Sequence, residues 1–233
     1  WMHGGGYIIG KPEMEDELCI QFVRELGIGI VSVDYRLAPK HPFPAGLEDC
    51  YSAMIWAKQN SDQFGFDATR IGVGGTSAGG RLAAALAQLA QDRKEVSPIF
   101  QLLRYPMLDD RTALRTDIDD SNSPTWSQKN NRFGWEAYLG KDYGANELPA
   151  HSVPARREDL SGLPPAWIGV GTLDVFYEEN MLYAQRLKEA GIECDLNIVK
   201  GAFHGFDVFD QQLPIVQEFR NSQINALKKY LVG

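Results

Sequence analysis

The sequence predicts an α/β protein in which helices cover both faces of a mostly parallel sheet. Short apolar runs alternate along the chain with longer stretches that have apolar residues at three- and four-residue spacing. The length of 233 residues, with 44% hydrophobic and 23% charged residues, suits a single domain (1–233) with a substantial buried core.

Five segments are typical of buried strands. The first two, 28–35 and 70–75, do not alternate cleanly between polar and apolar residues, as expected for strands that are covered on both sides. We expect the other three strands at 98–105, 166–171 and 195–199.

Four stretches have helical periodicity and are predicted to form the crossover and closing helices of this sheet. Gly191 is a predicted helix end, and the prolines that follow the first strand indicate an extended loop. The four stretches are 46–59, 78–93, 178–190 and 215–231.

Residues 109–160 interrupt this rhythm. They are rich in Asp, Asn, Ser, Arg and aromatic residues and contain no buried-strand pattern. Such an insertion follows the carboxyl end of a strand, which is where ligand crevices form in open α/β sheets. We therefore expect 109–160 to lie over the sheet as part of a lid or substrate pocket.

The run G-T-S-A-G at 75–79 follows an apolar strand and precedes an Ala/Leu-rich helix, the context in which G-x-S-x-G carries a nucleophile. A strand that turns directly into a helix at Ser77 strains its backbone and exposes its hydroxyl, and the flanking glycines let the two segments approach. The amide of Ala78 opens the helix and is a candidate oxyanion donor. The alternative interpretation is a glycine-rich turn with an N-cap serine.

The run His3-Gly4-Gly5-Gly6 is a second glycine motif. Consecutive glycines are costly in conformational entropy, which favours a role in which bare backbone faces a ligand. We expect Gly5 and Gly6 to supply further oxyanion donors and His3 to order the loop. A flexible loop is the alternative.

The chain has four histidines, and His204 is the candidate base because it follows the last predicted strand. His41 and His151 fall in a proline-rich loop and in the insertion, where a surface or loop-ordering role is expected. Asp174 follows another strand and is the candidate acid. The order along the chain is then nucleophile, acid and histidine, which is the order found in α/β-hydrolases. We expect Asp174 to orient the imidazole.

Two alternatives to this assignment of the acid stay open. Asp174 could instead cap the helix that follows it. Glu178 and Glu179 are fallback acids, although they lie about a helical turn further along the chain.

The composition argues against several other classes of protein. A net charge of −8 without a long basic run does not suit a nucleic-acid binder, and no long apolar run predicts a membrane span. Three distant cysteines favour neither a zinc site nor a disulfide framework, and they suggest a cytoplasmic location. No metal or organic cofactor is implied. Because the sequence opens at Trp1, we expect further polypeptide upstream, where an export signal would be hidden.

With these motifs and the runs V-D-Y-R-L-A-P (33–39), H-P-F-P-A (41–45), Y-P-M-L-D-D (105–110) and F-H-G-F (203–206), nearly the whole chain resembles the hormone-sensitive-lipase-like (bacterial family IV) esterases of the α/β-hydrolase fold. The resemblance implies a carboxylesterase for short to medium acyl esters. The implied triad is Ser77, Asp174 and His204, with Gly5, Gly6 and Ala78 as oxyanion donors. It also suggests a homodimer.

Two departures from the family pattern are visible. Thr76 stands where many relatives carry Asp, which marks a subgroup, and the first strands and cap helices that usually precede the glycine motif are missing from this sequence.

Trp126, Trp135 and Phe206 are candidates for the acyl or alcohol pocket, with a place in the core as the alternative. An amidase or N-formyl hydrolase with the same triad, and a non-catalytic small-molecule receptor of the same fold, are the alternative functions.

Overall fold

A computed structural model describes residues 1–233. Its centre is a parallel sheet, and neighbouring strands in the sheet are also consecutive in the sequence. All four carboxyl ends therefore lie along one edge. The strands are, in order, β1 (Gly72–Thr76), β2 (Phe100–Arg104), β3 (Ala166–Gly171) and β4 (Cys194–Val199). The predicted α/β class with a mostly parallel sheet is confirmed.

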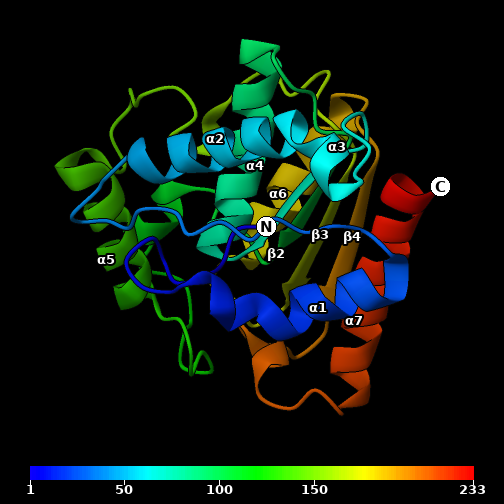
Figure 1. Ribbon diagram of the computed structural model, residues 1–233. Helices are drawn as coiled ribbons and strands as arrows, with labels where there is room; N and C mark the ends of the chain where they lie inside the picture. Colours follow the sequence, from blue (N-terminus) through cyan, green and yellow to red (C-terminus); the bar gives the residue numbers. More distant parts are fainter.

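Helices cover both faces of the sheet, as predicted (Figure 1). One face packs against α2 (Ala45–Gln59), α4 (Ala78–Arg93) and α6 (Tyr177–Glu189), and α3 (Ser61–Phe64) follows α2. The other face packs against α1 (Asp16–Leu26) and α7 (Pro214–Leu227), which continues as a π-helical turn to Val232. Adjacent side chains of β2 show the division, since Leu103 joins the first apolar cluster and Leu102 the second.

The prediction of a regular strand at 28–35 is wrong. The segment is extended, but its only bridge pairs Val33 with Met2, which also bridges Gly75 of β1. The segment around Met2 therefore lies between 28–35 and β1, and the amide of Val33 donates to the carbonyl of Trp1 at 2.9 Å. Because the chain turns away into the glycine loop directly after His3, this pairing ends after one bridge.

Helices α1 and α5 (Gln128–Leu139) are not among the predicted elements. Only Cys19 and Phe22 of α1 are buried, so its apolar stripe is narrow. The buried side of α5 mixes Trp135 and Tyr138 with polar residues, which hides a helical period.

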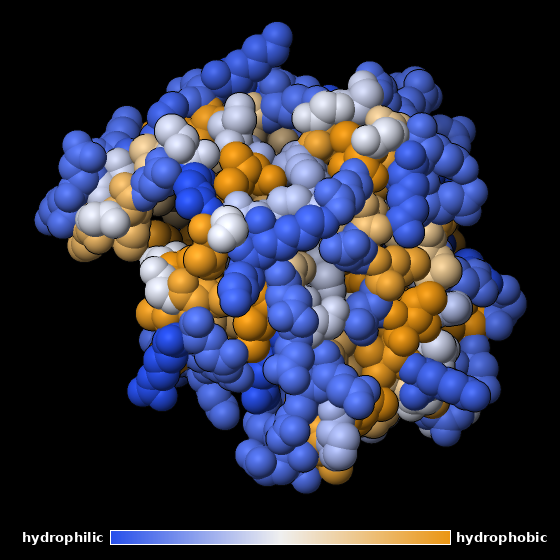
Figure 2. Space-filling model, turned by 90° about the vertical axis from the view of Figure 1, so that its right-hand side faces the viewer, coloured by the Kyte–Doolittle hydropathy of each residue, from blue (hydrophilic) through white to orange (hydrophobic).

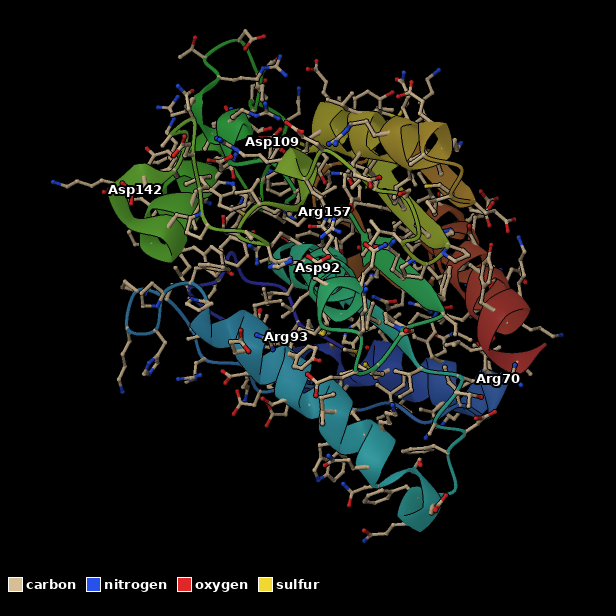
Figure 3. All side chains as sticks on the ribbon, turned by 90° about the horizontal axis from the view of Figure 1, so that it is seen from above. Arg70, Asp92, Arg93, Asp109, Asp142 and Arg157 are labelled. Atoms are coloured by element: carbon tan, nitrogen blue, oxygen red, sulfur yellow. The ribbon has the colours of Figure 1, made fainter.

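The segment 109–160 contains α5 and short 3-10 turns, and it packs around a third apolar cluster with Tyr7 and Met107. Its end is tied to the sheet layers by an ion pair. Asp92 of α4 lies beside Arg157, which donates to both of its carboxylate oxygens at 2.7 and 2.8 Å (Figure 3).

The face of the molecule on the side of α7 and the C-terminus is mixed, with patches of hydrophobic residues between hydrophilic ones (Figure 2). Ile215 at the start of α7 and Val232 near the chain end are both exposed hydrophobic residues. None of the helices combines the length and the hydropathy that a membrane-spanning helix needs.

Candidate active site

Ser77 lies in the sharp turn between β1 and α4. Its backbone angles, φ 58° and ψ −117°, are rare for a residue with a side chain. The flanking glycines make the turn possible, because a Cβ on Gly75 would lie 2.5 Å from the backbone of Gly79. The Ser77 amide donates to the carbonyl of Arg104 at 2.8 Å, and its carbonyl accepts the amide of Met107 at 3.2 Å. These bonds hold the strained turn at the carboxyl edge of the sheet.

His204 and Asp174 come to the same edge from two further strands. Asp174 lies in the turn between β3 and α6, and His204 in the loop after β4. Nδ1 of His204 lies 2.7 Å from Oδ2 of Asp174, and Nε2 lies 2.9 Å from Oγ of Ser77. Because a carboxylate only accepts, Nδ1 carries the proton and Nε2 is free to accept that of the serine hydroxyl.

Asp174 is not the cap of α6, since the N-cap residue of this helix is Phe176. The second oxygen of Asp174, Oδ1, accepts the amide of Phe176 at 2.9 Å at the start of the turn into α6. A local bond therefore orients the carboxylate toward the histidine. The fallback acids lie elsewhere, since Glu178 pairs with Arg115 and Glu179 accepts the amide of Leu108 at 2.6 Å.

The three side chains are shielded from water. Ser77, Asp174 and His204 are exposed by only 5–6% of their surface. The imidazole is packed edge-on between the rings of Tyr105 and Phe176, with centroids 4.7 and 5.1 Å away. This packing restricts the ring to the orientation that joins the two hydrogen bonds.

The glycine loop lies against Ser77. A Cβ on Gly4 would be 3.6 Å from the Cβ of Ser77, and the two glycines that follow have positive φ, 119° and 57°. The amides of Gly5, Gly6 and Ala78 donate to no group of the protein. The amides predicted as oxyanion donors are therefore free to bind a ligand.

His3 orders this loop. The side chain is buried and stacks on Tyr35 with ring centroids 4.2 Å apart, and Nδ1 lies 2.7 Å from the carbonyl oxygen of Gly4. Burial lowers the pKa of His3, which keeps the imidazole neutral. Nε2 of His151 instead lies 2.7 Å from Oδ2 of Asp92, away from Ser77. No hydrogen bond joins His41 to Ser77, Asp174 or His204.

The structure separates the three aromatic pocket candidates. Trp126 lies beside the site, because a Cβ on Gly6 would be 2.6 Å from Cζ2 of its ring and the ring centroid is 6.4 Å from that of His204. Trp135 is fully buried in the third apolar cluster, and Phe206 packs on Phe219 under the sheet. Of the three, Trp126 is the one that lies against Gly6 of the glycine loop.

Sequence reasoning misses a buried arginine below Ser77. Arg104 ends β2, and its guanidinium contacts Glu15, Thr76 and Asp207. The available signal is a charged residue at the end of a strand that is buried along its whole length. No group of three or more His, Cys, Asp or Glu side chains could hold a metal ion, and the three cysteines are buried thiols.

Comparison with known proteins places the chain in a family. A family model described as alpha/beta hydrolase fold matches residues 1–208. Esterase LipI of Mycobacterium tuberculosis is 34% identical over 233 residues, which is 100% of this chain and 72% of LipI. Ethyl acetate hydrolase of Pseudomonas putida is 28% identical over 232 residues, 99% of this chain and 72% of that protein.

Solved structures agree with the sequence comparisons. A bacterial heroin esterase superimposes with a TM-score of 0.93 at 36% identity, covering 99% of this chain and 74% of that one. Esterase LipW from Mycobacterium marinum gives 0.90 at 37% identity, covering 100% and 72%. By its sequence and its fold, the chain belongs to the α/β-hydrolase fold family, among the hormone-sensitive-lipase-like esterases.

Proposed function

We propose that this chain is a carboxylic-ester hydrolase in which Ser77 is the nucleophile, His204 the base and Asp174 the acid that orients it. The pair of hydrogen bonds that joins the three side chains carries the proposal. The names of the relatives, which are esterases and carboxylesterases, support an ester as substrate. We propose short to medium acyl esters, as the family resemblance implies.

In the proposed first step, Oγ of Ser77 attacks the acyl carbon while Nε2 of His204 takes the hydroxyl proton. The carbonyl oxygen becomes an oxyanion, which the amides of Gly5, Gly6 and Ala78 would bind. The buried carboxylate of Asp174 stabilises the imidazolium that forms. Ala78 begins α4, so the helix dipole adds to its donor strength.

In the proposed second step, the tetrahedral intermediate collapses and the alcohol leaves with the proton of His204. The acyl group stays on Ser77 as an ester. Water then attacks this ester and gives a proton to His204. The second tetrahedral intermediate collapses, His204 returns the proton to Oγ of Ser77, and the carboxylic acid leaves. No redox partner or metal enters this scheme.

We further propose that 109–160 is an insertion within one α/β-hydrolase domain and supplies a wall of the substrate pocket. The hydroxyl of Thr125 donates to the carbonyl of His204, and Ser123 donates to that of Leu173 at 3.2 Å. Between these anchors and the oxyanion loop lies the ring of Trp126. Residues 123–126 of the insertion therefore contact the loop that carries His204 on one side and Gly6 on the other.

Hydrolysis of p-nitrophenyl butyrate by the wild type, by Ser77→Ala and by Ser52→Ala tests the proposal. Ser52 is an exposed helix serine that bonds only its own helix, which makes it a matched control. We expect turnover by the wild type and the control and none by Ser77→Ala. A fluorophosphonate should label Ser77, which peptide mass spectrometry identifies.

Parallel turnover of the matching butyryl anilide separates an esterase from an amidase. We expect the ester to be hydrolysed far faster, since the anilide needs help for its amine leaving group. Faster anilide hydrolysis would assign an amidase. No turnover of either substrate, with no labelling of Ser77, would refute the proposed hydrolase and favour a receptor.

A further inference from the structure

A buried guanidinium lies next to the turn between β1 and α4 that carries Ser77, which we call the elbow. Arg104 is exposed by only 5%. Its Nη1 donates to Oγ1 of Thr76 at 2.9 Å and to Oε2 of Glu15 at 3.3 Å, and its Nη2 pairs with Asp207. Burial of an ion is costly even when it is paired, and an apolar residue of similar volume often gives equal stability. Stability alone therefore does not account for this cluster.

The partners of Arg104 belong to three separate parts of the site. Oε1 of Glu15 accepts the amide of Gly4 in the oxyanion loop at 3.4 Å. Thr76 directly precedes the nucleophile, and its hydroxyl also donates to Glu15 at 3.0 Å. Asp207 lies in the 3-10 turn that follows the histidine loop.

Two further contacts link the cluster to the triad. The carbonyl of Arg104 accepts the amide of Ser77 at 2.8 Å, so the same residue holds the strained backbone. Oδ1 of Asp207 accepts the hydroxyl of Tyr105 at 2.8 Å, and that ring packs edge-on against His204. Arg104 thus contacts residues that hold the nucleophile, the base and the oxyanion loop in place.

The guanidinium stays charged at every pH at which the protein is folded. Burial lowers the pKa of Arg104, but the attraction of Asp207, Tyr105 and Glu15 outweighs burial and leaves the pKa above its ordinary value. Its planar fork serves several acceptors at fixed angles, which a lysine ammonium does not do.

We propose that Arg104 is a positioning residue for the ester hydrolysis, which fixes the oxyanion loop, the elbow and the histidine loop relative to one another. The inference rests on the proposed function. Arg104 contacts neither a triad side chain nor the three oxyanion amides, so it acts through Glu15, Thr76 and Asp207. Small shifts of reacting groups cost rate more than affinity, which separates this role from substrate binding.

The test compares Arg104→Met, Arg104→Lys and, as the control, Arg93→Met. Arg93 also pairs with a glutamate, Glu48 at 2.6 Å, and lies over the ring of Tyr51, but on the surface of α4. Turnover of p-nitrophenyl butyrate is divided by the number of active sites titrated with a fluorophosphonate. This correction removes any loss that comes from unfolded protein.

We expect kcat per active site to fall about 10- to 100-fold in Arg104→Met with little change in KM, by analogy with small misplacements of catalytic groups. Arg104→Lys should recover part of the loss, because the ammonium can pair with Asp207 but lacks the fork. Arg93→Met should match the wild type. A kcat per site within about twofold of the wild type in both Arg104 variants would overturn the proposal.

Amide hydrogen exchange gives a readout that does not depend on turnover. In Arg104→Met we expect faster exchange than in the wild type in both 3–9 and 203–208, with no change in α5. If Arg104→Met does not fold, Thr76→Val takes its place. Unchanged exchange in the two loops would refute the positioning role. If the wild type hydrolyses no ester, the proposed function fails, while the exchange data still decide whether Arg104 holds the loops.

Discussion

A side-chain carbon on Gly79 would lie 2.5 Å from the carbonyl carbon of Met2. The segment that carries the oxyanion loop is therefore in backbone contact with the first turn of α4, two residues beyond Ser77. This contact places the start of the glycine loop beside the turn that carries Ser77. It also makes glycine obligatory at a helical position where alanine is otherwise preferred by about 1 kcal/mol.

We predict that Gly79→Ala lowers the free energy of unfolding by about 3 kcal/mol, because the methyl group must displace the Met2 backbone. The control is Gly191→Ala, where a Cβ meets nothing within 4 Å and only the positive φ of 78° is unfavourable. That strain costs about 1 kcal/mol. Urea unfolding measures both, and equal losses in the two variants would contradict the steric argument.

The second prediction concerns the acid. Asp174→Asn should keep the bond to the Phe176 amide and the fold, but its amide would hold His204 in the wrong tautomer. We expect kcat to fall by about 10³- to 10⁴-fold, as for comparable triads. Glu178→Gln changes the fallback acid, which is exposed, and should leave kcat unchanged. Steady-state hydrolysis of p-nitrophenyl butyrate compares the two variants, and a larger loss in Glu178→Gln would move the role of the acid there.

The elbow and the order of the site residues can be predicted because their signals are local. Gly75, Ser77 and Gly79 stand within five residues, between an apolar strand and a helix, and steric requirements alone select that pattern. Asp174 and His204 each follow a strand directly. In a parallel sheet all such positions meet at one edge, so their convergence follows from the topology.

The rest depends on contacts between distant residues. Arg104 and Asp207 are separated by 103 residues in sequence, and no local sequence pattern predicts that they pair. The segment 28–35 has the composition of a strand, yet its hydrogen bonds depend on what lies beside it, here Met2 at a single bridge. Trp126 and Trp135 have the same residue type in the same insertion, and only packing places one beside Gly6 and the other in the core.

The third prediction follows from the place of Trp126. Trp126→Ala should remove a wall next to the oxyanion loop and raise kcat/KM for octanoate relative to butyrate esters by about tenfold, as expected for added room for methylene groups. Trp56→Ala is the control, because Trp56 is exposed on α2 and packs on Phe64. The ratio is measured with p-nitrophenyl esters. An unchanged ratio in Trp126→Ala would place the acyl pocket elsewhere.

The fourth prediction concerns Glu179, a buried carboxyl that the proposed reaction does not use. Its Oε1 accepts the amides of Leu108 and Asp109 at 2.6 and 3.3 Å, while Oε2 has no partner. Burial raises the pKa of Glu179 well above its ordinary value, although hydrogen bonds to the carboxylate oppose the shift. The folded state therefore binds this proton more tightly than the unfolded state does.

Because the folded pKa is raised, the stability that the protonated carboxyl contributes is complete below the unfolded pKa and is lost as pH rises toward the folded value. Glu179→Gln removes this titration, so the stability of the wild type relative to the variant should fall with rising pH, by up to about 1.4 kcal/mol per pH unit. Urea unfolding at about pH 5, 6.5 and 8 measures the slope. A flat difference for Glu179→Gln would mean that the carboxylate is ionised in the folded protein.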